Sequence, residues 1–280
     1  MIEGQPSRTA LAAAAARAAH QQLEGGLIFR DPLAVAILGD EGAAMLEEAR
    51  TGQRRPMRIF IASRSRFAED SIANAVASGL GQLVILGAGL DTFAYRHPHG
   101  DTLNIIEVDH PSTQLWKRDS LHQAGIAVPP TLRYAPIDFE RETLLQALAQ
   151  ASFDPNRRSF FMWLGVVPYL TETAVFATLS TIASLPGGAE IVFDYSDPPA
   201  LLPPETREMH EAYAARVAAM GETWITHFDP DDLHARLSAC GFTTIEDLGI
   251  PELSRRYFPS PDIPATRRGG HVVRAARHTE

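Results

Sequence analysis

Two reactive residue types are almost missing from this sequence. Its 280 residues include one cysteine, Cys240, and one lysine, Lys117. A single cysteine excludes an intramolecular disulfide and a zinc cluster built on several thiolates. Because 25 − 1 = 24 of the basic residues are arginines, we attribute the shortage of lysine to the composition of the genome and not to function.

Long apolar runs and an excess of positive charge are missing as well. No segment approaches the roughly 20 apolar residues that a membrane-spanning helix needs, and the N-terminus lacks the pattern of a signal peptide. The net charge of −9 disfavours a nucleic-acid binder, which needs a basic surface. We therefore expect a soluble, cytoplasmic protein that binds neither membranes nor nucleic acid. The sequence leaves its oligomeric state open.

The hydrophobic content of 45% predicts a folded chain with a sizeable core. We expect a single domain over residues 1–280, made of a helical cap segment over 1–79 and a Rossmann-like core over 80–280. In the cap segment, Asp31 and Pro32 predict the start of a helix, with Asp31 as its N-cap. Residues 54–78 predict one long helix.

The core alternates between strand and helix patterns, which is typical of an α/β fold. Seven strands are predicted, over residues 83–86, 103–108, 132–137, 159–163, 189–195, 242–248 and 271–275. We expect a mostly parallel sheet with helices on both faces, in which the last two strands pair antiparallel. The proline-rich insert 196–228 predicts either a lid over the ligand crevice or a purely structural excursion. Residues 251–264 predict a loop.

A glycine-rich turn follows the first predicted strand. It reads Gly-Ala-Gly-Leu-Asp-Thr over residues 87–92, and Asp109 ends the next strand, 109 − 87 = 22 positions on. This spacing is typical of a nucleoside site, in which the acidic residue binds the ribose. A dinucleotide site has a third glycine where Thr92 stands, and its helix N-terminus is free for pyrophosphate. Asp91 puts a carboxylate there, which favours the phosphate-free nucleoside S-adenosylmethionine (SAM) over NAD.

Arg64 lies between Phe60 and Phe67 on the apolar face of the predicted long helix. A guanidinium in such a place needs a partner, because an unpaired buried charge is expensive. An internal ion pair, a side chain that extends to solvent and a ligand carboxylate are all open, since arginine suits bidentate carboxylate recognition.

Five stretches of the chain together resemble the leucine carboxyl methyltransferase family, in its bacterial branch of class I SAM-dependent methyltransferases. They are residues 30–34 (RDPLA), 63–66 (SRSR), 86–92 (LGAGLDT), 107–111 (EVDHP) and 163–171 (WLGVVPYLT). The resemblance covers about residues 7–197, and the last third of the chain matches poorly.

This resemblance implies a class I methyltransferase fold, SAM as methyl donor and an oxygen nucleophile as acceptor. It implies that Arg64 binds the SAM carboxylate, with Arg17 as a second contact, and that Asp109 binds the ribose. The remaining cofactor residues that we assign are Gly87, Ala88, Gly89, His110, Asp138, Phe139 and Trp163. Trp163 is open between adenine and core packing. Where leucine-modifying members have glutamate, this chain has Leu164, which puts a leucine carboxyl substrate in doubt.

The acceptor side is less clear from the sequence. Tyr169, Asp194 and Tyr195 lie near predicted strand ends and are candidate substrate contacts, and we identify no catalytic residue and no metal site. His227 stands close to two aspartates, but Asp229 is better explained as a helix cap. We predict a SAM-dependent O-methyltransferase acting on a carboxylate or hydroxyl of a small molecule. A non-catalytic SAM-binding or partner-binding protein and an NAD-dependent oxidoreductase are the alternatives.

Overall fold

The computed structural model describes residues 7–40, 42–137, 142–258 and 268–278, and it divides into two compact units, Met1–Phe153 and Asp154–Glu280. Its strands follow the order β3-β2-β1-β4-β5-β7-β6 in a seven-stranded sheet, and β7 is antiparallel to both of its neighbours. This confirms the predicted fold class, including the antiparallel pairing of the last two strands. The division into a cap segment and a core within one domain stays a prediction.

The first unit begins with helices, as the sequence predicts. They are α1 (Arg8–Leu23), α2 (Ala34–Leu38), α3 (Ala43–Ala49) and, after the short 3-10 turn η1 (Gly52–Arg54), the long helix α4 (Arg55–Ala77). The side of α1 that carries Leu11, Ala14 and Ala18 is buried in a cluster with residues of α2 and α3. Small side chains allow such close approach between helices, so an alanine-rich segment forms a packed helix here rather than a surface one.

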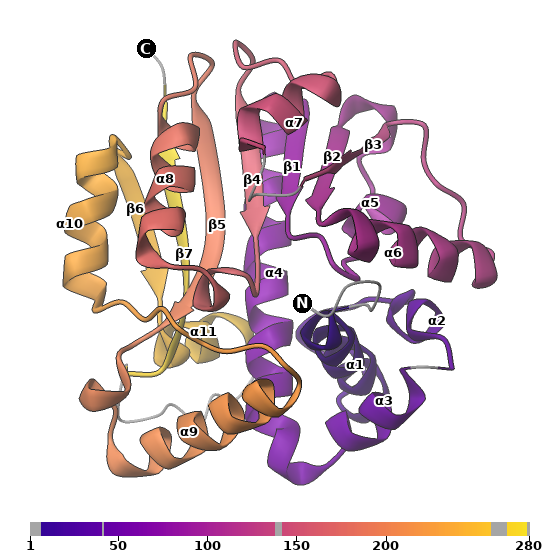
Figure 1. Cartoon of the computed structure of the whole chain (residues 1–280), viewed down its shortest axis with the longest axis vertical. Helices are drawn as coiled ribbons and strands as arrows, with labels where there is room; N and C mark the ends of the chain where they lie inside the picture. Colours follow the sequence, from indigo (N-terminus) through magenta and orange to yellow (C-terminus); the bar gives the residue numbers. More distant parts are fainter. Residues whose placement is uncertain (1–6, 41, 138–141, 259–267, 279–280) are drawn as a thin grey trace. The chain divides into compact units, whose positions relative to one another are not determined.

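The strands of the first unit are β1 (Gln82–Leu86), β2 (Asn104–Asp109) and β3 (Leu132–Pro136), and they pair in parallel. Every residue of β1 is buried, as expected of a strand covered on both faces. The connections contain α5 (Phe93–Arg96), η2 (Gly100–Thr102) and α6 (Pro111–Gln123), and α7 (Leu144–Gln150) follows β3. In Figure 1, α1, α2 and α3 lie beyond the carboxyl ends of these strands.

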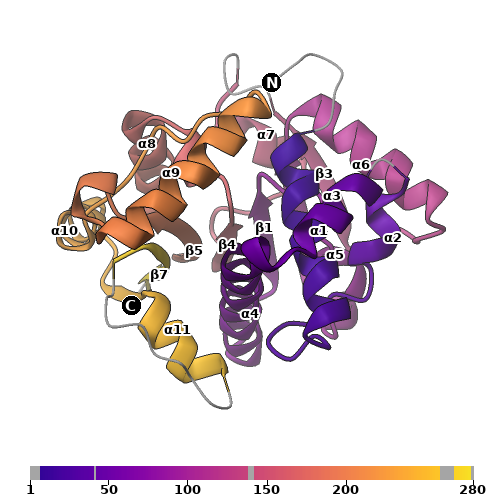
Figure 2. The same ribbon diagram turned by 90° about the horizontal axis from the view of Figure 1, so that it is seen from below.

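The second unit contains β4 (Ser159–Trp163) and β5 (Ala189–Ser196) in parallel, and β7 (Gly270–Arg277) between β5 and β6 (Thr244–Leu248). Its other elements are η3 (Val167–Tyr169), α8 (Glu172–Ala183), η4 (Pro199–Leu201), α9 (Pro204–Ala219), α10 (Pro230–Cys240) and α11 (Ile250–Tyr257). Thr171 caps α8 and Asp229 caps α10, as predicted. Figures 1 and 2 show α9, which belongs to the insert 196–228, beyond the carboxyl ends of β4 and β5.

Two local predictions need correction. Helix α2 begins at Ala34, later than predicted. Asp31 keeps the predicted capping contact, since its Oδ1 atom accepts a hydrogen bond of 3.2 Å from the N–H of Leu33, but its buried carboxylate also accepts one from Arg17. The predicted loop 251–264 contains most of α11. Pro251 sits in the first turn of α11, where a missing backbone N–H does no harm, so this proline starts a helix instead of breaking one. No helix in the described part of the chain is long and apolar enough to cross a membrane.

The lysine of this chain is part of the core. Lys117 on α6 is only 1% exposed, and its ammonium nitrogen lies 2.8 Å from Oε2 of Glu107, a buried residue of β2. Burial raises the pKa of Glu107 to about 7, against the opposing effect of Lys117. The position therefore carries a structural ion pair, which composition alone does not indicate.

We predict that Lys117→Met destabilises the fold by about 3–5 kcal/mol, because it leaves the Glu107 carboxyl buried without its cation. The free energy of unfolding from urea titration measures the effect. The double variant Lys117→Met/Glu107→Leu should recover most of the loss, since both charges are then absent. A single variant as stable as the natural chain would show that the pair is not needed.

Candidate active site

The turn after β1 has the geometry that its glycines predict. Gly87 and Gly89 have φ angles of +61° and +45°, a region that favours glycine. A Cβ atom added to Gly89 would lie 3.0 Å from the Cβ atom of Ala10. The Asp91 carboxylate accepts a hydrogen bond of 2.8 Å from the backbone N–H of Phe93 at the start of α5. The structure thus places a carboxylate at this helix N-terminus, as the sequence predicts.

Asp109, at the end of β2, is bound to that same turn. Its Oδ2 atom accepts a hydrogen bond of 2.6 Å from the N–H of Gly89, and its Oδ1 atom accepts one of 2.7 Å from the N–H of His110. Burial raises the pKa of Asp109, and the two backbone donors oppose the rise. Each carboxylate oxygen keeps further acceptor capacity, so a fixed acceptor lies beside the glycine turn.

The other predicted cofactor residues of the first unit differ in how they are held. Nδ1 of His110 accepts a hydrogen bond from the N–H of Ser112 and caps α6, so the proton of the neutral ring is on Nε2. Ala88 is buried in the turn, and Arg64 is half-buried in the middle of α4. Asp138 and Phe139 lie outside the described residues.

The sequence analysis missed the part that Asp31 plays in holding this turn. Asp31 accepts hydrogen bonds of 2.8 Å from Nε of Arg17 and of 2.7 Å from the hydroxyl of Thr92. Nε of Arg96 donates to the same hydroxyl, and its guanidinium pairs with Glu69 of α4. Burial raises the pKa of Asp31, but the two arginines outweigh burial and hold it below its usual value. The available signal was the stretch 30–34, which we interpreted as a helix start.

Arg17 therefore has a structural part in the site. Besides its ion pair with Asp31, its Nη2 atom donates a hydrogen bond of 2.7 Å to the carbonyl of Leu90, inside the turn. Thr92 occupies the place of the third glycine of a dinucleotide fingerprint, and its hydroxyl links the turn to Asp31. The departure from the dinucleotide pattern thus has a structural use.

The second unit repeats the arrangement of Asp109. Asp194 of β5 is 4% exposed, and its Oδ1 atom accepts a hydrogen bond of 2.6 Å from the N–H of Gly165. Gly165 follows β4 and has a φ angle of +70°. Trp163, at the end of β4, is buried with its ring centroid 6.3 Å from that of Phe193, and Tyr169 is half-buried in η3.

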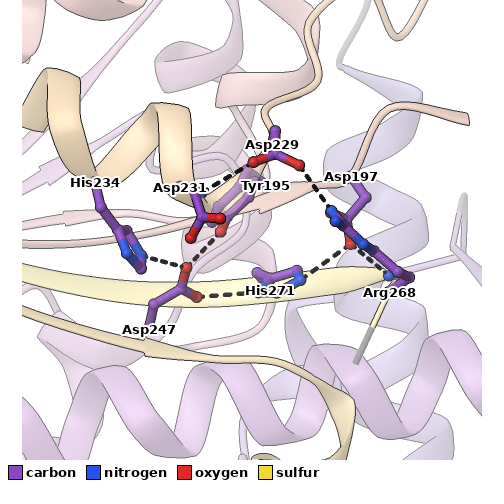
Figure 3. A network of polar contacts seen from close by, with 9 residues as sticks. Tyr195, Asp197, Asp229, Asp231, His234, Asp247, Arg268 and His271 are labelled. Atoms are coloured by element: carbon purple, nitrogen blue, oxygen red, sulfur yellow. Dashed lines mark hydrogen bonds and ion pairs between the residues drawn. The ribbon is translucent and has the colours of Figure 1, made fainter. Parts of the chain in front are cut away.

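Tyr195 lies in a network of polar and charged side chains (Figure 3). Because successive side chains of a strand alternate between the two faces of a sheet, Tyr195 and Asp194 lie on opposite faces of β5. The Tyr195 hydroxyl donates a hydrogen bond of 2.5 Å to Asp247, and its ring stacks on His271. His271 bridges Asp247 and Asp197, with 3.1 Å from a ring nitrogen to each carboxylate. The network is completed by further contacts to Arg268, Asp229 and His234. Tyr195 therefore has a protein partner for its hydroxyl, and its contact with substrate stays a prediction.

Residues 10–183 match the model of the leucine carboxyl methyltransferase family. This span exceeds half of the chain, and the chain belongs to this family, which confirms the predicted resemblance.

Individual relatives agree with this assignment. A Bacillus subtilis protein named as a candidate SAM-dependent methyltransferase, YktD, is 31% identical over 92% of this chain and 93% of its own length. A Mycobacterium avium protein of similar name is 32% identical over 79% of this chain and 76% of its own length. These names bear out the predicted class of cofactor.

Two solved structures share the fold at low sequence identity. They are a DUF574 family protein from Streptomyces avermitilis and a magnesium protoporphyrin IX methyltransferase from Synechocystis with bound S-adenosylhomocysteine. The first has a TM-score of 0.54 at 14% identity, over 94% of this chain and 97% of that one. The second has a TM-score of 0.50 at 12% identity, over 81% and 88%.

The network around His271 predicts a pH-dependent stability. Burial lowers the pKa of His271, but Asp197 and Asp247 outweigh it and raise this pKa from 6.5 to about 9. A raised histidine pKa stabilises the fold fully below about pH 6.5, and the stabilisation is lost as the pH rises through about 9. Thermal unfolding between these values should show a falling melting temperature. His271→Gln should flatten that dependence, whereas His278→Gln, at an exposed position, should keep it; an equal slope in His271→Gln would contradict the assignment.

Proposed function

We propose that this chain is a SAM-dependent O-methyltransferase that transfers a methyl group to a hydroxyl or carboxylate of a small molecule. The observation that carries the proposal is the Asp109 carboxylate held on the N–H groups of Gly89 and His110, beside a helix N-terminus that Asp91 occupies. Together they offer a ribose acceptor next to a turn that repels phosphate. Family membership supports the same reaction class.

The residues present fit SAM. Asp109 would accept the ribose hydroxyls, the backbone of residues 87–89 would follow the methionine part, and the half-buried Arg64 would bind the carboxylate. Trp163, Asp138, Phe139 and His110 are proposed for the remaining surface of the cofactor. SAM supplies an electrophilic methyl group on a sulfonium sulfur. The chain contributes position and alignment, which are worth several kcal/mol in a displacement reaction.

Where leucine-modifying members of the family have glutamate, the side chain of Leu164 offers no polar contact. This difference supports a small-molecule acceptor over the carboxyl group of a leucine. Tyr169, Asp194 and Tyr195 are proposed acceptor contacts, of which Tyr169 is half-buried. The insert 196–228, with α9 at the carboxyl ends of β4 and β5, is proposed as the lid of the acceptor site. We further propose that the protein is cytoplasmic. Its net charge of −9 supports the proposal that it has no nucleic-acid partner.

The first test compares two nucleosides by isothermal titration calorimetry. We predict binding heat with SAM and none with NAD, since the Asp91 carboxylate occupies the place of a pyrophosphate. Heat with NAD and none with SAM would overturn the proposal in favour of an oxidoreductase. SAM binding without methyl transfer to any class of acceptor would favour a non-catalytic SAM-binding protein.

The second prediction concerns Asp109→Ala. Hydrogen bonds to a charged group contribute about 1.5–3 kcal/mol each, so losing two ribose contacts should weaken SAM binding by a factor of about 100 or more. Calorimetry measures the affinity, and circular dichroism checks the fold. Asp119→Ala, at an exposed position of α6, is the matched control and should bind SAM normally. Unchanged affinity in Asp109→Ala would refute the ribose assignment.

A further inference from the structure

The first unit contains a cavity that the proposed methyl transfer does not use. Its volume is about 480 Å³, and sites for small organic ligands usually measure roughly 300–1,000 Å³. Residues 24–30, which follow α1, line one side of it, and one face of α4 and residues of the segment 93–99 line the others. Every lining residue belongs to the first unit, and none of the described residues proposed for SAM is among them.

The buried part of the lining is apolar and aromatic. Ile28, Phe29 and Phe93 line the cavity, and all three are buried. The ring centroid of His99, which also lines it, lies 6.4 Å from that of Phe93, and the His97 ring stacks on both of these rings. Aromatic rings pack favourably against other flat rings. The cavity therefore suits a ligand with a flat apolar body.

One arginine of the lining has no carboxylate partner among the described residues. Three carboxylates line the cavity, and each of them pairs with an arginine. The pairs are Glu24 with Arg58, Glu69 with Arg96 and Asp70 with Arg66. Arg30 lines the cavity as well, at an exposed position, and no described carboxylate lies within ion-pair distance of it. A guanidinium suits bidentate recognition of a carboxylate, so the lining offers one cation to an anionic ligand.

The wall of the cavity is connected to the glycine turn by two contacts. Arg96, the partner of Glu69, donates a hydrogen bond of 2.8 Å from Nε to the hydroxyl of Thr92. Phe93, whose ring lines the cavity, donates its N–H to the carboxylate of Asp91. The same turn donates to the proposed ribose acceptor. A ligand that holds Phe93 and Glu69 in place therefore also holds residues that fix the turn.

We propose that this cavity is a regulatory site for a small organic anion with a flat apolar body, such as an aromatic carboxylate, and that the bound anion strengthens SAM binding. Arg30 pairs with the carboxylate, and the rings of Phe93 and His99 pack against the flat body. The ligand restricts the motion of the segment that holds the turn, so less ordering remains when the cofactor binds. Only this coupling rests on the proposed function, since the anion site itself needs no SAM.

Three compounds with the same flat body test the class of ligand by isothermal titration calorimetry. Cinnamate carries a carboxylate, cinnamamide is neutral, and cinnamylamine is a cation at neutral pH. We expect cinnamate to bind about 10-fold more tightly than the amide, because a hydrogen bond to a charged acceptor is stronger than a neutral one. Cinnamylamine should bind most weakly. Equal affinities of cinnamate and cinnamylamine would contradict an anion site.

Two variants test the place of binding. Arg30→Gln should weaken cinnamate binding about 10-fold and leave the binding of cinnamamide unchanged, because only the charged contact is lost. Ala73→Trp, which fills the cavity from α4, should abolish the binding of both compounds. Arg55→Gln and Asn74→Trp are the matched controls, at exposed positions of α4 that do not line the cavity, and they should bind as the natural chain does. Melting temperatures check that each variant folds.

The coupling is measured with S-adenosylhomocysteine, which permits no methyl transfer. Saturating cinnamate should raise the affinity for S-adenosylhomocysteine about 5-fold, and S-adenosylhomocysteine should raise the affinity for cinnamate by the same factor. Hydrogen exchange of the Phe93 N–H should slow when cinnamate binds. Both effects should be absent in Ala73→Trp and kept in Asn74→Trp.

Several results would refute the proposal. The absence of binding heat with cinnamate, or cinnamate binding that neither Arg30→Gln nor Ala73→Trp reduces, would exclude the cavity as an anion site. An unchanged or lower affinity for S-adenosylhomocysteine in the presence of bound cinnamate would exclude the regulatory role. Methyl cinnamate formed from SAM at a rate that Ala73→Trp leaves unchanged would make cinnamate an acceptor instead. If cinnamate binds and S-adenosylhomocysteine does not, the proposed function fails and the coupling with it, while the anion site stands.

Discussion

The site depends on one type of hydrogen bond, in which a strand-end carboxylate accepts the N–H of a left-handed glycine after the neighbouring strand. Asp109 of β2 holds Gly89 in this way, and Asp194 of β5 holds Gly165, each at 2.6 Å. A charged acceptor makes such a bond stronger than a neutral one. The bond fixes turns whose positive φ angles favour glycine, and in the case of Asp109 it fixes the carboxylate that we propose binds the ribose. The Asp109 carboxylate and the glycine turn beside it are thus in place before a ligand binds.

A second layer of charges keeps the first of these turns in place. Asp31 receives Arg17 from α1 and Thr92 from the turn, and Arg96 connects the same hydroxyl to Glu69 of α4. Two guanidinium groups face two carboxylates, so the buried charges balance and their desolvation is offset by close pairing. Side chains of α1 and α4 therefore help to hold the turn. The contacts of Asp31 give a physical reason for the family resemblance around residues 30–34.

Charge also separates the two roles of histidine in the second unit. His271 lies between Asp197 and Asp247, which stabilise its protonated form and make it part of the scaffold. His210 and His227 face each other, and burial lowers the pKa of both. The neighbours of each ring, and not the residue type, thus decide whether the protonated or the neutral form is favoured.

The sequence by itself determined the seven strands, the glycine turn and the positions of Asp91 and Asp109, because hydrophobic periodicity and turn chemistry are local. It predicted the fold for the same reason. Only the tertiary structure decided that Asp31 also holds Thr92, that Tyr195 faces Asp247, and that His210 meets His227. Those contacts join residues 61, 52 and 17 positions apart. No local pattern specifies such a partner, because the choice depends on which faces of helices and strands pack together.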